Sequence, residues 1–106
     1  MEELQLTPQQ WHQLATAIVI WTGWERASSP TRRDSDVLRA FGAEAPALLL
    51  LIAQVNDVFN TSDAWRRASS LSDVAEFAKS DGHSKLPKLP RDALAALAWC
   101  YSFDYK

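Results

Sequence analysis

The stretch LTPQQWHQLATAIVIW, residues 6–21, carries the clearest structural signal in this sequence of 106 residues. Thr7 has a side-chain oxygen that can accept a hydrogen bond from the backbone of a starting helix, and Pro8 suits the first helical position. Gln10, three residues after Thr7, completes the pattern of a capping box. The stretch therefore predicts a helix that begins at Thr7.

Mostly apolar residues continue this helix at the three- and four-residue spacing of one helix face. The positions with this spacing are Trp11, Leu14, Ala15, Ile18, Trp21 and Glu25. Residues 18–21 (IVIW) also favour a β-strand, but no turn residues precede them. We therefore expect a largely buried helix that extends to Glu25.

A second, shorter helix is expected after a break in the pattern. Residues 28–33 (SSPTRR) predict an exposed loop. Asp34 or Ser35 can then cap a short helix. This helix should end at Phe41, because Gly42 suits a left-handed helix end.

Residues 46–59 (PALLLLIAQVNDVF) form the most apolar segment of the chain. Pro46 can open a helix here because a proline at the first helical position lacks only an N–H that would have no partner. The first two turns of this helix are apolar almost all round, and such a helix has to be surrounded by others. The segment predicts the central helix of a bundle.

The second half of the chain contains further helix boundaries. Residues 60–63 (NTSD) are turn and cap residues that precede a short helix over residues 64–68. Ser70 and Asp73 resemble a capping box at the start of another helix. Gly82 is expected to end that helix.

The last helix should begin at Pro90, after an extended segment over residues 83–89 (HSKLPKL). Its expected core stripe consists of Leu94, Leu97, Ala98 and Tyr101. No internal repeat or domain linker is present. The chain therefore predicts one all-α domain over residues 1–106, a bundle of about five helices around the apolar helix at residues 46–59.

The residue counts exclude several classes of function. Three glycines leave no glycine-rich loop for a phosphate or a dinucleotide. Two histidines and one cysteine cannot supply the four ligands of a structural zinc site, and a lone cysteine forms no internal disulfide. We therefore expect no metal and no cofactor.

The chain also lacks the expected marks of export or membrane insertion. Residues 1–6 (MEELQL) are acidic, whereas a secretory signal peptide begins with basic residues. The longest apolar run, residues 47–53, is far shorter than the roughly 18 to 20 residues of a membrane span. A soluble, cytoplasmic protein is expected.

Charge is nearly balanced overall but uneven along the chain. The formal net charge of −2 is too small for a protein that binds nucleic acid by bulk attraction to phosphate. Residues 44–81 carry six acids and three bases, whereas residues 82–106 carry two acids and four bases. An acidic middle suits a basic protein partner, although solvated helix faces are the simpler explanation.

No group of residues points to catalysis. Asp81, His83 and Ser84 are the residue types of a nucleophilic triad, but triads converge from distant positions, and neighbours in a loop point apart. Cys100 lies in an apolar helix, where an unpaired cysteine packs as a small apolar side chain. We expect no enzyme activity, and a weak enzyme with an unrecognised site is the least favoured hypothesis.

The main alternative is a small regulator that binds nucleic acid. Arg32 and Arg33 in the first loop, with Arg66 and Arg67 in the middle of the chain, can form a local basic patch. However, the best candidate for a recognition helix, residues 63–70, offers only two arginines and a tryptophan.

The five tryptophans are more than one helix face can bury. Trp11 and Trp21 belong to the core stripe of the first helix, which leaves Trp24, Trp65 and Trp99. Small helical domains can complete their core with a peripheral tryptophan, and exposed tryptophans are enriched in protein interfaces. Both explanations remain open from the sequence.

The ending AALAWCYSFDYK, residues 95–106, and the small helical character of the chain resemble bacterial immunity proteins of contact-dependent growth inhibition and related polymorphic toxin systems. Such proteins share no diagnostic motif, so no residue role is transferred. The resemblance implies a cytosolic protein that binds a cognate toxin domain, often a nuclease, and blocks its active site or substrate path.

These observations predict a non-enzymatic protein-binding module that neutralises a toxin through an acidic and aromatic surface. The candidate partner-binding residues are Asp57, Asp63, Trp65, Asp73 and Glu76. The four acids would meet a basic surface on the toxin, and Trp65 would supply a desolvated anchor. We expect no small-molecule ligand and no membrane association, and nucleic acid is a partner only under the arginine alternative.

Overall fold

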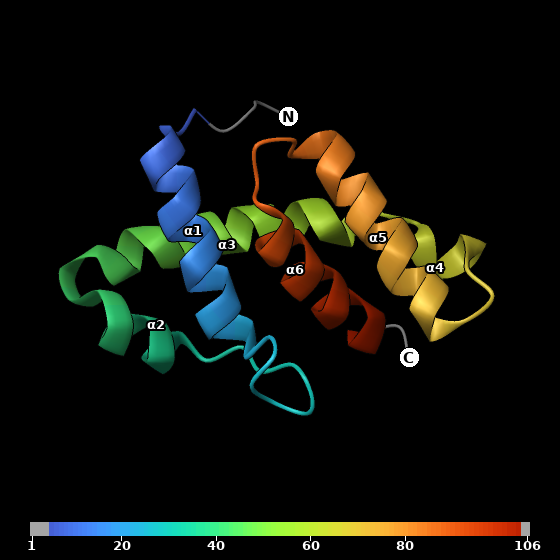
Figure 1. Ribbon diagram of the computed structural model, residues 1–106, viewed down its shortest axis with the longest axis horizontal. Coiled ribbons are helices and arrows are strands. Elements are labelled where there is room, and N and C mark those ends of the chain that lie inside the picture. The colour runs from blue at the N-terminus through green and yellow to red at the C-terminus, as the bar shows by residue number, and fades with distance from the viewer. Residues whose placement is uncertain (1–4, 105–106) are drawn as a thin grey trace.

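The computed structural model describes residues 5–104, and all of its regular structure is helical (Figure 1). The elements in chain order are α1 (Pro8–Thr22), α2 (Asp34–Phe41), the 3-10 turn η1 (Gly42–Glu44), α3 (Ala45–Asn60), α4 (Ala64–Arg67), α5 (Leu71–Lys85) and α6 (Arg91–Asp104). No strand occurs within the described range, which confirms the predicted all-α class. Residues 1–4 and 105–106 of the predicted domain lie outside that range.

The helices form two layers. In Figure 1, α6 lies between α1 and α5, and α3 crosses behind them. The molecule measures 42 × 32 × 18 Å. Its shortest dimension suits two layers of helices, because packed helix axes lie about 8–10 Å apart. α6 therefore has neighbours on both flanks and behind.

The middle of the bundle is α6, and the predicted central position of residues 46–59 is not confirmed. Eight of the 14 residues of α6 are buried, against six of the 16 residues of α3. Leu50 on α3 is 69% exposed. Alanines at buried positions of α6 let several helices approach it closely. The sequence predicts the leucine-rich α3 as the central helix instead, because alanine is less hydrophobic than leucine.

The predicted number of helices is not confirmed either. Within residues 5–104, four helices have 14 to 16 residues (α1, α3, α5 and α6), whereas α2 has eight and α4 only four. The four long helices supply most of the buried apolar side chains, which form one cluster. The short helices α2 and α4 lie at opposite ends of α3 (Figure 1).

α1 begins as its sequence predicts. The backbone N–H of Gln10 donates to the hydroxyl of Thr7 at 3.1 Å, and the backbone N–H of Thr7 donates to the side-chain oxygen of Gln10 at 2.8 Å. Both bonds of a capping box are therefore present. The buried positions of Trp11 and Trp21 confirm that they belong to the core.

The predicted end of α1 at Glu25 is wrong. The helix ends at Thr22, because Gly23 adopts a left-handed conformation with φ 75° and its N–H donates to the carbonyl of Val19 at 3.1 Å. A glycine here avoids the clash between a side chain and the backbone that disfavours positive φ. The loop that follows runs to residue 33.

α2 and α3 lie close to the predicted positions. Gly42 has φ 56° and follows the last residue of α2, and Pro46 lies in the first turn of α3. However, Asp34 does not cap α2. Its carboxylate accepts a hydrogen bond from the indole N–H of Trp21 at 2.9 Å, which ties the start of α2 to α1.

α5 begins as predicted, with a partial capping box. The hydroxyl of Ser70 accepts from the backbone N–H of Asp73 at 3.1 Å. The carboxylate of Asp73 accepts from the hydroxyl of Ser69 at 2.8 Å rather than from the backbone of Ser70. The start of α5 is thus stabilised by two neighbouring serines.

The predicted end of α5 at Gly82 is wrong. The helix continues to Lys85, so the predicted extended segment begins only at residue 86. Gly82 is buried inside the helix and packs against α3. A Cβ added at Gly82 would lie 2.4 Å from Cζ of Phe59, far inside van der Waals contact. The glycine is therefore required by helix packing and not by a helix end.

α6 follows a short, anchored connection. Leu86 and Leu89 are buried, and the backbone N–H of Leu94 donates to the carbonyl of Pro90 at 3.1 Å at the helix start. The predicted core stripe is confirmed, because all of its members are buried; they are Leu94, Leu97, Ala98 and Tyr101. Its burial places the C-terminal helix in contact with every long helix of the bundle.

Candidate functional site

The turn between α3 and α4 is held by hydrogen bonds of Ser62. The backbone N–H of Ser62 donates to the carbonyl of Phe59 at 3.0 Å, which reverses the chain after α3. The hydroxyl of Ser62 accepts from the backbone N–H of Ala64 at 3.1 Å. The turn and cap role of residues 60–63 is therefore confirmed, and Ser62 rather than Asp63 supplies the side-chain cap.

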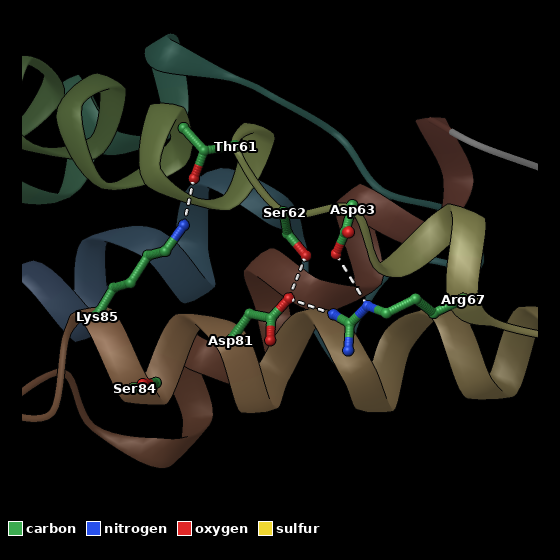
Figure 2. A pocket seen from close by; sticks show the side chains of 7 residues that line it. All are labelled: Thr61, Ser62, Asp63, Arg67, Asp81, Ser84 and Lys85. Atoms are coloured by element: carbon green, nitrogen blue, oxygen red, sulfur yellow. Dashed lines mark hydrogen bonds and ion pairs between the residues drawn. The ribbon is translucent and has the colours of Figure 1, made fainter.

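Asp81 on α5 connects this turn to α4 (Figure 2). One of its carboxylate oxygens accepts from the hydroxyl of Ser62 and from the guanidinium of Arg67, both at 2.6 Å. Arg67 also donates from Nε to the carboxylate of Asp63 at 2.9 Å. A single arginine thus bridges the carboxylate of Asp63, just before α4, and that of Asp81 on α5. Charge-assisted bonds of this kind are among the stronger hydrogen bonds.

These side chains line an open pocket of about 430 Å³. Its lining residues are Thr61, Ser62, Asp63, Arg67, Asp81, Ser84 and Lys85. At one edge, Nζ of Lys85 donates to the hydroxyl of Thr61 at 2.6 Å (Figure 2). The two acids and two bases of the lining balance in charge. The bonds across this pocket join the turn after α3, and α4, to α5.

Tyr101 of α6 fixes α4 from the core side. Its buried hydroxyl donates to the carbonyl of Ser62 at 2.7 Å and accepts from the backbone N–H of Trp65 at 3.4 Å. A four-residue helix has too few internal hydrogen bonds to be stable alone. The contacts to α5 and α6 supply the stability that α4 lacks.

Replacing Tyr101 with phenylalanine should lower the free energy of unfolding by about 1–2 kcal/mol, because the carbonyl of Ser62 loses its buried donor. Denaturant titration measures this loss. Amide hydrogen exchange of residues 62–67 should also become faster, since α4 loses an anchor. The matched control is Ser102→Ala, whose hydroxyl bonds only within α6 at 2.8 Å. Unchanged exchange in residues 62–67 would show that Tyr101 does not hold α4.

Two aromatic rings are exposed beside this network. Trp65 on α4 is 46% exposed and Phe77 on α5 is 37% exposed. The guanidinium of Arg66 lies 5.5 Å from the ring centre of Trp65, and that of Arg67 lies 5.3 Å from the ring centre of Phe77. Both distances suit cation–π interactions. We call this region the α4–α5 surface; it comprises Asp63, Trp65, Arg66, Arg67 and Phe77.

The structure places the predicted partner-binding residues in three groups: Asp63 and Trp65 lie at the start of α4, Asp73 and Glu76 lie on α5, and Asp57 lies on α3. Asp73 lies in the first turn of α5, and Asp57 is exposed on α3. Glu76 lies about one turn after Asp73 on α5, where it pairs with Lys79 at 3.5 Å. Glu76 lines a different pocket, with Leu89 and Arg91 among its other residues.

The arginines of the nucleic-acid alternative occupy two separate regions. Arg32 in the first loop pairs with Asp104 at 2.7 Å, and this hydrogen-bonded carboxylate raises the pKa of Arg32. Arg67 on α4 is engaged by two carboxylates, as described above. Among the carboxylates of residues 5–104, none pairs with Arg33 or Arg66. Half of the predicted basic patch is thus neutralised within the chain.

The residues considered for catalysis are dispersed. Asp81 and Ser84 line the pocket of Figure 2, whereas His83 lines the pocket that contains Glu76. Cys100 is fully buried, as its apolar helix predicts. Burial raises the pKa of the Cys100 thiol to about 11, against a smaller lowering effect of Arg32. At neutral pH this side chain is a protonated thiol.

The three unassigned tryptophans divide into two groups. Trp24 and Trp99 are half-buried and stack edge to face, with ring centres 5.4 Å apart. Phe103 extends this stack, at 5.9 Å from Trp99. Of these three tryptophans, only Trp65, on α4, is an exposed surface residue.

Sequence reasoning missed three members of the site. The sequence places Arg66 and Arg67 in a candidate nucleic-acid patch, and no feature of the sequence singles out Phe77. The spacing of four residues between Asp63 and Arg67 is a local signal for their ion pair. No local signal connects Arg67 to Asp81 or Phe77, because these contacts join different helices.

Comparisons of the chain with protein-family models, with curated proteins and with solved structures find no match. Within residues 5–104, no three His, Cys, Asp or Glu side chains are grouped so as to hold a metal ion. In the same range, no helix has both the length and the hydropathy to cross a bilayer. The α4–α5 surface is therefore the main structural indication of function.

Proposed function

We propose that this chain is a non-enzymatic protein-binding module whose docking site is the α4–α5 surface. The observation that carries the proposal is the pair of exposed aromatic rings, Trp65 and Phe77, each beside a guanidinium. Tryptophan and arginine are the residues most enriched among those that dominate binding energy in protein interfaces. Exposed apolar side chains are common singly, but each of these two rings has a guanidinium beside it, and aromatic and arginine side chains are enriched in protein interfaces.

The rigidity of α4 supports the same proposal. Binding is weakened when side chains or loops have to become ordered at the interface. Here the hydrogen bonds of Asp81 and Tyr101 hold α4 before any partner arrives. Trp65 is thus presented on a fixed backbone, which lowers the entropic cost of docking.

Charge indicates the kind of partner. The α4–α5 surface itself carries one acid, Asp63, and two bases, Arg66 and Arg67, but the segment around it is acidic. Residues 44–81, which include α3, α4 and most of α5, carry three more acids than bases. An excess of acid around a docking site accelerates association with a basic surface and disfavours acidic partners. We propose a toxin domain with a basic, nucleic-acid-binding surface as the partner, with this chain as its cytosolic immunity protein. This assignment rests on the resemblance of residues 95–106, of which residues 105–106 lie outside the described range.

Isolation of the partner from the native host tests the proposal. The tagged chain should retain one protein in a one-to-one complex that survives nuclease treatment. The variant Trp65→Ala should lose this protein, and Leu50→Ala on α3 should retain it. A nuclease-sensitive complex with nucleic acid would instead support the arginine alternative and overturn the proposal.

Neutralising the four candidate acids together should weaken binding of the isolated partner and flatten its dependence on salt. The changes are Asp57→Asn, Asp63→Asn, Asp73→Asn and Glu76→Gln. We expect association at low salt to slow by roughly tenfold or more, because steering by charge is lost. Stopped-flow mixing at several salt concentrations measures this effect.

A control variant neutralises three exposed acids outside α3, α4 and α5, namely Glu25, Glu44 and Asp92, and so removes three negative charges rather than four. This control should leave the association rate and its salt dependence close to those of the wild type. If both variants slow association equally, net charge rather than an acidic docking site is responsible. If neither does, the partner does not meet the four acids.

A further inference from the structure

A second pocket lies between the end of α1 and α2, away from the α4–α5 surface. Its volume is about 440 Å³. Three arginines line it, Arg26 and Arg33 from the loop after α1 and Arg39 from α2, together with the single carboxylate of Asp36. The three arginines are separated by six or seven positions in the sequence, so only the folded chain brings them to one pocket.

The loop that carries Arg26 and Arg33 is held against the end of α1. The backbone N–H of Arg33 donates to the carbonyl of Trp21 at 3.1 Å, and the backbone N–H of Thr31 donates to the carbonyl of Thr22 at 2.8 Å. The hydroxyl of Thr31 also donates to the carbonyl of Trp21 at 2.9 Å. These bonds satisfy the last carbonyls of α1, which a helix end otherwise leaves without partners.

The same loop contains an unfavourable backbone conformation. Glu25 has φ 67°, in the left-handed region that a residue with a side chain rarely adopts. Such a residue costs of order 1 kcal/mol and persists where surrounding contacts impose it. Here it directly precedes Arg26, whose backbone N–H donates to the carbonyl of Gly23 at 2.9 Å. The loop therefore positions Arg26 at the pocket at an energetic cost.

The arginines of the pocket are poorly neutralised. Neither Arg26 nor Arg33 forms an ion pair with any of residues 5–104, and Arg39 lies 4.0 Å from Asp36 with a largely exposed side chain. Arg32, between the two loop arginines, turns instead to Asp104 on α6. Three guanidiniums and one carboxylate leave the pocket with a net charge of +2.

The remaining walls of the pocket are apolar or small. They are formed by side chains such as Ile20, Ala27 and Ala40. Pockets for small molecules combine apolar walls with a few well-placed polar groups. An inorganic anion would contact the arginines but would leave the apolar walls exposed to water. An organic molecule with an anionic group would contact both the arginines and the apolar walls.

We propose that this pocket binds the phosphate monoester group of a small organic molecule. A phosphate monoester carries a charge of about −1.5 to −2 at pH 7, which is close in size to the net charge of +2 of the pocket. The planar guanidinium group donates two parallel hydrogen bonds to phosphate oxygens. The apolar walls would contact the organic part of the ligand. This site is independent of the proposed protein-binding function.

Titration calorimetry with phenyl phosphate and with inorganic phosphate tests this site. Both should bind, and phenyl phosphate should bind more tightly because its ring covers the apolar walls. Each of Arg26→Gln, Arg33→Gln and Arg39→Gln should weaken the binding of phenyl phosphate by roughly tenfold, the usual effect of losing a charged hydrogen bond. Because all three side chains are exposed, these variants should fold, which thermal melting can verify.

Two controls separate specific recognition from attraction by charge. Arg91→Gln removes an exposed arginine that lines another pocket, and it should leave affinity unchanged. Arg33→Lys keeps the charge but removes the paired donors, and it should weaken binding almost as much as Arg33→Gln. Equal loss in Arg91→Gln, or full binding by Arg33→Lys, would overturn the proposed geometry.

Competition with an oligonucleotide that lacks terminal phosphates tests whether the pocket binds a small phosphate monoester or the backbone of a nucleic acid. Its backbone diesters carry one charge each and should not displace phenyl phosphate. Displacement by this oligonucleotide, or absence of phenyl phosphate binding to the folded wild type, would overturn the proposal. The three glutamine variants should bind the protein partner as tightly as the wild type does, because these arginines lie away from the α4–α5 surface.

Discussion

Replacing Gly82 with alanine should lower the free energy of unfolding by about 2 kcal/mol, although alanine is the best helix former. The added Cβ would lie within 3.0 Å of three ring atoms of Phe59. That ring is 1% exposed and enclosed by the core, so it cannot swing into solvent. The strain of overpacking therefore exceeds the gain of about 1 kcal/mol from helix propensity.

Denaturant titration of four variants measures this effect and identifies its cause. In a chain that carries Phe59→Leu, the ring is absent and Gly82→Ala should cost much less than in the wild type. The control Ser80→Ala, at an exposed position of α5, should change stability by no more than about 0.5 kcal/mol. An increase in stability for Gly82→Ala would mean that α5 and α3 are not packed this closely.

The assignment of Gly82 shows where sequence patterns reach their limit. A glycine can end a helix through a left-handed conformation or can let two helices approach closely, and both need the absence of a Cβ. Gly23 ends α1 with φ 75°, whereas Gly82 lies within α5 against Phe59. The second role depends on a residue 23 positions away, which no local pattern reveals.

The helix starts were predicted well, because the residues that define them are neighbours. Thr7 and Gln10 form the two bonds of the capping box within four residues of chain. Ser70 likewise caps α5 through the next turn. The positions of helices along the chain follow from such local chemistry. The all-α class and most helix starts can therefore be predicted from the sequence.

The arrangement of the helices was less accessible. Residues 46–59 have the highest density of leucines, yet Leu50 faces solvent and the alanine-rich α6 occupies the middle. Small side chains allow close contact on several sides, whereas a run of leucines says only that some of them are buried. Which side is covered depends on where the other helices pack.

The candidate site shows the same division. The sequence predicts Asp63 and Trp65 as partner-binding residues, and the structure places Asp63 just before α4 and Trp65 on it. The contacts that fix α4 were not, because Tyr101 and Asp81 come from other helices. The arginine-lined pocket was equally hidden, since Arg26 and Arg33 carry no local motif.

Replacing Trp65 with alanine should weaken partner binding by roughly thirty-fold or more, which corresponds to about 2 kcal/mol. Truncation removes an exposed ring that no other side chain of α4 can replace, together with its contact to Arg66. The ring is nearly half exposed in the free chain, so its loss should change the stability of the fold much less than the affinity. Thermal melting of Trp65→Ala provides this check.

The dissociation constant of the isolated partner for three chains tests the role of the α4–α5 surface most directly. The chains are the wild type, Trp65→Ala and Leu50→Ala, and calorimetry measures each complex at one salt concentration. The proposed docking site predicts a large loss of affinity for Trp65→Ala and none for Leu50→Ala, although Leu50 is the more exposed side chain. Wild-type affinity in Trp65→Ala, with a loss in Leu50→Ala, would contradict it and place the partner on α3.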